Sequence, residues 1–499
     1  MKRAPFRPLA CLFVLAATLL AGAPARAIPQ VVLVQNSGWM EPFYADPKSP
    51  FKPLVASLVG SVARPGDALV LAAFNQSMPG APSPRGLLSE TVNADSAAHV
   101  RAALDRLDTA RKPNGAALAD TDLGEAVQAA IGQVLQGRPG LVWLFTNNRN
   151  SPNNDQATAE RNREFYALIH RGPAIARALA FPLRMPVQGK HYRANGLMVY
   201  VFAVGAEGER ALAALLAEGR VKRVITEPPA RLKPLDRDTV RLLPRKVEDA
   251  PGVAFSMEAN GMLRADVAPA ALEPFATVRW SLENAIYPYT IASASVGARS
   301  VLGGDNHRIV LEDGDVRRLA PGKGMPLASR MQLPVARLPG AWSLEAIKAA
   351  GSAYVLPGRI ELHLEKQRLE LSQAFRARMA ALFPGDPLPD IFTPPAEIQA
   401  STAALPIEVR VHYGSAPLVA LIGATLALLA LGAGGVYAAL RPRRVELVVE
   451  DELRTMRARA GSVQPIYDKA GRQVARLKTT MFGHQLLDLR EGAQVRLGR

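Results

Sequence analysis

The stretch Val31-Val-Leu-Val-Gln-Asn-Ser-Gly-Trp-Met40 begins with four apolar residues and ends abruptly in a polar turn that contains glycine. A continuous apolar run of this kind predicts a strand that is buried on both faces, as in a parallel sheet. In open α/β sheets, ligands collect beyond the carboxyl ends of the strands. We therefore expect Gln35, Ser37 and Trp39 to surround whatever this domain binds.

Strand and helix patterns alternate through residues 28–227, as a parallel sheet requires. The further predicted strands are Arg64–Phe74, Leu141–Thr146 and Leu197–Val204, and the predicted helices are Lys52–Val62, Ser96–Leu107 and Leu123–Leu135. The sequence thus predicts an α/β fold with a doubly wound, mostly parallel sheet. Residues 148–186 exceed the usual length of a strand-to-helix connection and predict an elaborated loop beside the site.

Three motifs follow one another at the ends of these predicted elements. They are Gln35-Asn-Ser37-Gly-Trp39, Ala119-Asp-Thr121-Asp-Leu-Gly-Glu-Ala-Val127 and Leu141-Val-Trp-Leu-Phe-Thr-Asn-Asn148. In this order they resemble the three loops of the metal-ion-dependent adhesion site of von Willebrand factor A domains. The resemblance implies a Rossmann-like domain over residues 28–227. It also implies a ligand site formed by Gln35, Asn36, Ser37, Trp39, Thr121 and Asn147.

The motifs depart from the family pattern at the positions that bind the cation. Gln35, Trp39 and Asn147 stand where the family has aspartate, serine and aspartate, so Ser37 and Thr121 are the ligands that remain. A divalent cation needs anionic or strongly dipolar oxygen ligands, and both carboxylates are lost. We therefore expect a degenerate site with no bound metal and no cofactor.

Three questions about this site stay open at the level of sequence. Asp120 or Asp122 could replace the missing negative charge and restore a metal ligand. Trp39 is either an anchor for a partner or a filler of the volume that the cation would occupy. The polar cluster either recognises a partner or satisfies itself through internal hydrogen bonds.

Residues 1–27 have the pattern of a secretory signal peptide, with a basic start, an apolar run from Leu9 to Leu20 and the cleavage motif Ala25-Arg-Ala27. The only cysteine, Cys11, lies in that run. After cleavage the exported chain could form no disulfide, so core burial alone must stabilise it.

Residues 228–415 change to short β-type runs separated by glycine, proline and aspartate, which predicts one or two antiparallel sandwich modules. The predicted strands are Val253–Met257, Thr277–Leu282, Tyr289–Val296, Arg308–Leu311, Met331–Val335, Arg359–Leu364 and Ile407–Tyr413. A helix is expected at 368–382. The proline-rich residues 384–395 are expected to form an extended connector.

Residues 416–440 contain no charged side chain and are long enough to span a bilayer as a helix. Arg441-Pro-Arg443-Arg444 follows at once, so the positive-inside rule places the C-terminus in the cytoplasm. Small residues along this helix permit close pairing with a second copy. Residues 441–499 carry 13 basic and 7 acidic side chains and predict a small β-rich cytoplasmic domain. We expect a single-pass protein of the bacterial inner membrane, with most of the chain in the periplasm.

The formal net charge of +16 is spread along the chain, which favours attraction to an anionic membrane over binding of nucleic acid. The seven histidines stand singly, without the spacing of a metal site or a catalytic triad. We therefore expect a protein that is not an enzyme and that binds or scaffolds another protein in the envelope. The alternatives are a transmembrane signalling protein and an envelope hydrolase whose active site has no recognised motif.

Overall fold

The computed structural model describes residues 27–113, 115–150, 155–271, 274–385 and 388–498. The expected signal peptide lies outside these residues, apart from its last one. The chain divides into two compact units. The first contains Met1–Arg337 and Leu356–Val409, and the second contains Leu338–Val355 and Arg410–Arg499.

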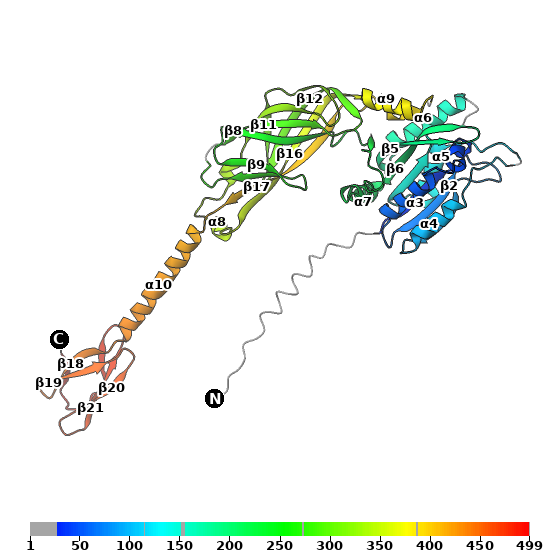
Figure 1. The fold of residues 1–499 in the computed structure, drawn as a ribbon. Coiled ribbons are helices and arrows are strands. Elements are labelled where there is room, and N and C mark those ends of the chain that lie inside the picture. The colour runs from blue at the N-terminus through cyan, green and yellow to red at the C-terminus, as the bar shows by residue number, and fades with distance from the viewer. Residues whose placement is uncertain (1–26, 114, 151–154, 272–273, 386–387, 499) are drawn as a thin grey trace. The chain divides into compact units, whose positions relative to one another are not determined.

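A seven-stranded sheet forms the α/β part of the first unit, in the order β3-β2-β1-β4-β6-β5-β7 (Figure 1). Its strands are β1 (Gln30–Gln35), β2 (Ala68–Phe74), β3 (Arg85–Thr91), β4 (Gly140–Thr146), β5 (Ile175–Gln188), β6 (Arg193–Val204) and β7 (Ala230–Lys233). Strand β1 pairs in parallel with both β2 and β4, so that Leu33 lies beside Ala72 and Leu144. The predicted strand at residues 31–34 is therefore confirmed at the centre of the sheet.

Helices cover both faces of this sheet and form two separate cores. One face packs against α2 (Glu41–Ala45), α3 (Phe51–Val62), α4 (Ser96–Asp105) and α7 (Gly205–Ala217), and the other against α5 (Leu123–Ala129), α6 (Asp155–Arg171) and α9 (Gln373–Leu382). Side chains alternate between the faces along a strand. Val32 and Val34 accordingly enter the first core, while Val31 and Leu33 enter the second. Because both faces of β1 are buried, successive residues of this strand are apolar, as expected.

The expectation of a mostly parallel sheet is correct only for β2, β1 and β4. The pairs β2–β3, β4–β6, β5–β6 and β5–β7 are antiparallel. Strands β5 and β6 are joined by a turn of four residues, 189–192, and a parallel connection needs a crossover of a dozen residues or more. In this turn Gly189 lies against the Glu41 carboxylate and leaves no room for a side chain.

The expected elaborated loop at 148–186 is also corrected, because the described part of this stretch contains α6 and most of β5. Strand β5 contains two prolines, Pro182 and Pro186, and proline is disfavoured inside a strand that is paired on both sides. Strand β7 pairs with β5 only at Ala178–Ala180, so both prolines lie where β5 is the edge of the sheet. An edge strand tolerates proline because the missing N–H is not needed there.

The remainder of the first unit is β-rich. Its strands are β8 (Val240–Glu248), β9 (Val253–Met257), β10 (Leu263–Val267), β11 (Phe275–Asn284), β12 (Tyr289–Leu302), β13 (Asp305–Leu311), β14 (Asp315–Leu319), β15 (Gly324–Gln332), β16 (Ala353–Leu371) and β17 (Ser401–His412). The pairs β8–β11, β11–β15, β12–β13, β12–β16 and β9–β10 are antiparallel, as expected. The sheet turns at β13, which pairs with β12 at one end and with β15 at the other. Phe255 of β9 contacts Trp280 of β11, with ring centroids 5.9 Å apart, so the two layers pack face to face.

After β16 the chain returns to the α/β core through α9 and the 3₁₀ helix η5 (Leu388–Phe392). The expected extended connector at 384–395 therefore contains a helical turn among its described residues. Phe375 and Phe392 are both buried in the second core, with ring centroids 5.0 Å apart. Residues far beyond position 227 thus complete the core of the α/β domain.

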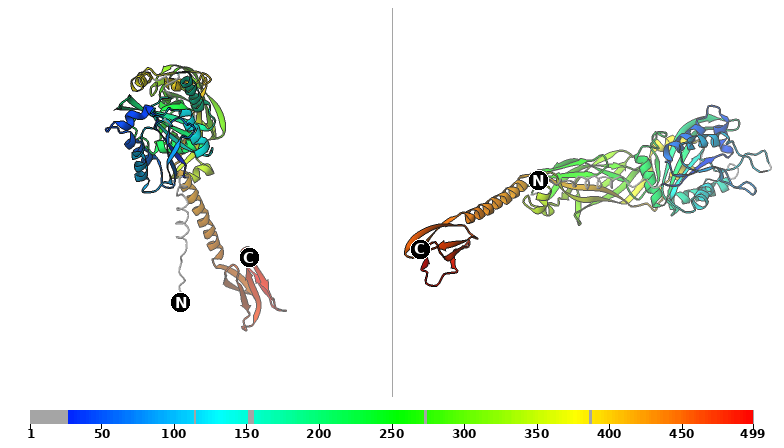
Figure 2. Two further views of the ribbon diagram at one scale, coloured as in Figure 1. Left: turned by 90° about the vertical axis from the view of Figure 1, so that its right-hand side faces the viewer. Right: turned by 90° about the horizontal axis from the view of Figure 1, so that it is seen from below.

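The second unit contains α10 (Ala416–Leu440), a single continuous helix in every view (Figure 2). It is the one helix among the described residues that is long and apolar enough to cross a membrane. The β-rich C-terminal region follows as two three-stranded sheets. These are β19 (Glu452–Ala458), β18 (Arg443–Val449) and β23 (Val495–Leu497), and then β20 (Val463–Tyr467), β21 (Gln473–Thr479) and β22 (His484–Leu487). Leu447 and Leu477, one from each sheet, are fully buried in one shared core.

Candidate functional site

A polar cluster lies where the parallel strands β1 and β4 end, as the sequence predicts. Gln35 ends β1 and Ser37 follows it, Thr146 ends β4, and Thr121 precedes α5. All four side chains have a relative exposure of 0%. Parallel neighbours end at the same edge of the sheet, which explains why residues more than 100 positions apart meet here.

Gln35 forms hydrogen bonds with the three other side chains of this cluster. Its Nε2 donates to Ser37 Oγ at 2.7 Å and to Thr121 Oγ1 at 3.0 Å. Its Oε1 accepts from the Thr146 hydroxyl and from the Asn147 backbone N–H, the latter at 3.2 Å. The side-chain amide therefore bridges all three loops of the predicted site.

The orientation of the Gln35 amide follows from its neighbours. A backbone N–H can only donate, so the atom that faces Asn147 N must be the amide oxygen. The amide N–H groups then point at Ser37 and Thr121, whose hydroxyl oxygens lie 2.6 Å apart. These oxygens are the two that the family resemblance retained as cation ligands.

This arrangement does not fit a bound divalent cation. A cation needs lone pairs directed at it, whereas here an N–H donor occupies the space between the two remaining hydroxyls. Among the residues that the structure describes, no group of three or more His, Cys, Asp or Glu side chains is placed to hold a metal. The site residues instead satisfy one another.

Asp120 and Asp122, the two candidate substitute ligands, are engaged elsewhere. Asp120 forms an ion pair of 2.6 Å with Lys112. Asp122 caps α5 by accepting from Glu125 N at 2.9 Å and pairs with Arg161 at 3.4 Å. Among the described residues, neither carboxylate forms a hydrogen bond with the hydroxyl pair of Ser37 and Thr121, so the geometry gives no support to a metal held by these aspartates.

The asparagines of the cluster support the loops around it. Asn147 Nδ2 donates to Trp39 O at 2.9 Å, which ties the β1 and β4 loops together. Asn36 Nδ2 donates to Asp108 O at 3.3 Å. Tyr44 donates to Gln35 O at 2.7 Å, and burial raises the pKa of this hydroxyl well above its ordinary value. The hydroxyl therefore remains a proton donor at every physiological pH.

Trp39 lies outside this buried network, at the wall of a recess. Its ring packs against Tyr192, with centroids 4.4 Å apart, and the Arg149 guanidinium lies 4.6 Å from its centre. Its Nε1 is buried and has no hydrogen-bond partner among the described residues. The recess has a volume of about 240 Å³ and is lined by Trp39, Asn147, Arg149, Tyr192, Arg193, Ala194, Asn195, Gly196, Leu382, Phe383 and Pro384.

Sequence reasoning missed Arg149, Tyr192 and Arg193 as members of this site. Arg149 lies at the start of residues 148–186, where an elaborated loop beside the site was expected, whereas Tyr192 lies in a hairpin turn that was not predicted. No carboxylate among the described residues forms an ion pair with Arg149 or Arg193. The recess is therefore aromatic and positively charged.

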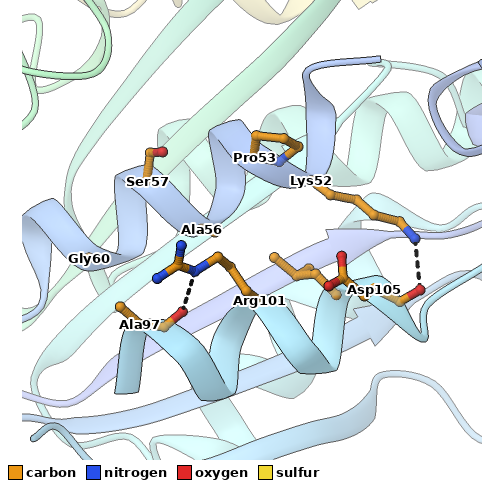
Figure 3. A pocket seen from close by; sticks show the side chains of 9 residues that line it. Lys52, Pro53, Ala56, Ser57, Gly60, Ala97, Arg101 and Asp105 are labelled. Atoms are coloured by element: carbon orange, nitrogen blue, oxygen red, sulfur yellow. Dashed lines mark hydrogen bonds between the residues drawn. The ribbon is translucent and has the colours of Figure 1, made fainter. Parts of the chain in front are cut away.

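A second groove lies between α3 and α4, with a volume of about 400 Å³ (Figure 3). Lys52 Nζ donates to Asp105 O at 3.2 Å, and Arg101 Nε donates to Ala97 O at 3.1 Å. These two side chains therefore donate to backbone carbonyl groups of α4. Neither helix contributes a residue to the predicted site.

No protein-family model matches this chain, and no curated protein matches its sequence. Among solved structures, von Willebrand factor type A from Catenulispora acidiphila is similar, with 12% sequence identity and a TM-score of 0.15. The match covers 36% of this chain and 57% of that protein, so the chain spans little more than half of its length. This likeness is weak.

Proposed function

We propose that this chain is a membrane-anchored protein that binds or scaffolds another protein in the bacterial envelope. The observation that carries the proposal is the recess of Trp39, Tyr192 and Arg149, beside a polar network that is already satisfied. Aromatic and arginine side chains dominate the energetics of protein interfaces. A hydrolase would need an activated nucleophile, and the buried Ser37 hydroxyl is bonded to Gln35 and Thr121.

The proposed topology places this recess outside the cytoplasm. The N-terminal sequence has the pattern of an export signal, and the three arginines that follow α10 favour a cytoplasmic C-terminus. Both signals assign residues 28–415 to the extracytoplasmic side of the inner membrane.

Binding through this recess is proposed to be independent of metal. The Gln35 amide holds the β1, α5 and β4 loops in place, which is the structural role that a cation would otherwise fill. Arg149 and Arg193 line the recess, and neither forms an ion pair with a carboxylate among the described residues, although Arg149 donates to Pro384 O at 3.0 Å. This charge favours a partner that presents an acidic side chain beside an apolar one.

The test is photo-cross-linking in intact membranes, with a photoreactive phenylalanine analogue in place of Tyr192 of the full chain. We expect a discrete cross-linked species that persists in EDTA and is lost when Arg149→Ala is added. Arg101→Ala in the α3–α4 groove is the matched control and should leave the species unchanged (Figure 3). An equal yield from the analogue at Ser57, or loss of the species in EDTA, would contradict the proposal.

A signalling role is the second candidate, favoured by the folded β-rich region that follows α10. A bare anchor needs no shared core such as that of Leu447 and Leu477. Truncation after Tyr413 separates the two roles. A scaffold should keep partner capture when the truncated chain is supplied with another anchor, whereas a signalling protein should lose its output.

A further inference from the structure

A short segment of the second unit, residues 339–350, lies next to the start of α10 and is called the foot below. It contains the helix α8 (Leu344–Lys348), which begins where the Ser343 side chain accepts from Ala346 N at 3.1 Å. Tyr413, three residues before α10, donates its hydroxyl to Pro339 O. The foot is therefore pinned to the chain at the point where the apolar helix starts.

The foot also contacts α10 itself, and α8 and α10 are neighbours in Figure 1. Pro417, in the first turn of α10, is buried, and Leu418 is partly buried. From Val419 to Ala438 the helix is exposed. Among the described residues, the burial of α10 is greatest at its first turn, and the foot lies at that level.

The foot exposes two large apolar side chains together with the charged Glu345 and Lys348. Trp342 is 70% exposed and Leu344 is 60% exposed, whereas Ala346 and Ala349 are buried behind them. A large aromatic side chain that stays exposed to water does not gain the free energy that burial of its apolar surface would provide. Next to a membrane-spanning helix, the same exposure places the ring at the boundary between lipid and water.

The length of α10 fixes the depth of this boundary. Twenty-five residues span about 37 Å at 1.5 Å per residue, against a hydrocarbon core of about 30 Å. The excess of about 7 Å, shared between the two ends, places about two or three residues at each end among the lipid headgroups. The first turn, which the foot contacts, lies at that depth.

The two ends of α10 differ in their aromatic residues. At the C-terminal end, Tyr437 and Arg441 form the aromatic and cationic pair of a membrane interface, with the guanidinium 5.0 Å from the ring. The first half of the helix contains no aromatic residue. Trp342 lies two residues before α8, the helix that contacts this end of α10, although it is 74 residues away in sequence from Ala416.

We propose that the foot is a membrane-binding site, in which Trp342 and Leu344 insert between the lipid headgroups and the ends of the acyl chains. The ligand is the lipid–water interface of the membrane that α10 crosses. Trp342 supplies the interfacial aromatic anchor that this end of α10 lacks. The proposal is independent of the recess and of its partner.

The test is quenching of tryptophan fluorescence in the full chain, reconstituted into vesicles whose phosphatidylcholine is brominated near the headgroup end of the acyl chains. Trp143 and Trp280 are 1% and 2% exposed, so lipid cannot reach them. We expect clear quenching in the unaltered chain and loss of most of it in Trp342→Phe. Trp39→Phe is the matched control and should retain it.

A second probe covers the case in which Trp342→Phe disturbs the fold. An environment-sensitive dye on Leu344→Cys should show a blue-shifted emission in vesicles and quenching by the same brominated lipid, while the dye on Ser57→Cys should show neither. Quenching that survives Trp342→Phe and disappears in Trp39→Phe would overturn the proposal. A dye at position 344 that reports only water would overturn it as well.

Discussion

The Gln35 side-chain nitrogen lies 3.0 Å from the Thr121 hydroxyl oxygen, although 86 residues separate the two in sequence. This contact joins the loop after β1 to the loop before α5. With the bonds from Gln35 Oε1 to the end of β4, it makes one glutamine side chain the common support of three loops.

Gln35→Ala should therefore destabilise the α/β domain substantially. The change leaves the hydroxyls of Ser37, Thr121 and Thr146 without their shared partner, and a buried unsatisfied polar group costs about 1–3 kcal/mol. We expect a loss of about 3–5 kcal/mol after partial relaxation of the site. Urea unfolding of the full chain in detergent measures it. Gln188→Ala, at an exposed position of β5, is the control and should change stability by less than about 0.5 kcal/mol.

The metal preference of the site should change only when three residues change together. Gln35→Asp and Asn147→Asp restore two carboxylates, and Trp39→Ser restores a hydroxyl, so the triple variant offers the oxygen ligands that a dication needs. Calorimetric titration with Mg²⁺ or Ca²⁺ should show a measurable site in the triple variant and none in any single variant. The unaltered chain should show no site tighter than about the millimolar range. Micromolar binding by the unaltered chain would instead point to Asp120 or Asp122.

The sequence predicted those parts of the fold whose signal is local. The apolar run at residues 31–34, the helical spacing in α3 and the uncharged run of α10 each depend on neighbours in the chain. The polar site was also predicted, because parallel strands bring their carboxyl ends together. The sequence did not show which hydrogen bonds form inside the site, because the bonds of Gln35 depend on where three separate loops meet.

The parts that were missed depend on distant contacts. Tyr192 reaches Trp39 only because β5 and β6 form a hairpin, and Pro182 and Pro186 concealed β5. Phe375 packs on the α/β sheet from a position 148 residues beyond the expected domain end at 227. The periodicity of apolar residues does not show that a later segment packs back onto an earlier domain.

The return of the chain through α9 and η5 should be essential for the α/β domain. Phe375→Ala or Phe392→Ala removes a buried ring and should cost about 3–5 kcal/mol in urea unfolding. The double variant should cost less than the sum, because the two rings touch. Phe275→Ala, at a ring that is 40% exposed, should cost less than about 1 kcal/mol. A fragment ending at Glu227 should expose this core face and aggregate, and a stable monomeric fragment would refute the assignment of α9 to this core.

The proposed topology predicts opposite results for two reporter fusions. A reporter that is active only in the cytoplasm should work when fused after Arg499 and should be silent when fused after Tyr413. The reason is the cluster Arg441, Arg443 and Arg444, which favours the cytoplasmic side. Replacing the three arginines by glutamine should reduce the activity of the fusion after Arg499. An active fusion after Tyr413 would reverse the assigned orientation.

His170 should make the docking of η5 sensitive to pH. Its Nε2 donates to Ile391 O at 2.9 Å, and its ring packs on Tyr166 with centroids 4.3 Å apart. Burial lowers the pKa of His170 below its ordinary value of 6.5, although the hydrogen bond to Ile391 opposes this shift. Nearby Lys233 and Arg171 lower this pKa further, while Glu397 raises it.

A lowered histidine pKa means that the unfolded chain takes up the proton first as the pH falls. The contribution of neutral His170 to stability is therefore complete above pH 6.5 and is lost progressively below it, down to the pKa in the folded chain. The thermal unfolding midpoint should fall between about pH 7.5 and about pH 5, and His170→Gln, which keeps an N–H donor without titrating, should reduce that fall. His191→Gln, at an exposed turn, should leave the fall unchanged. A pH profile of His170→Gln that coincides with that of the unaltered chain would show that η5 docks independently of this proton.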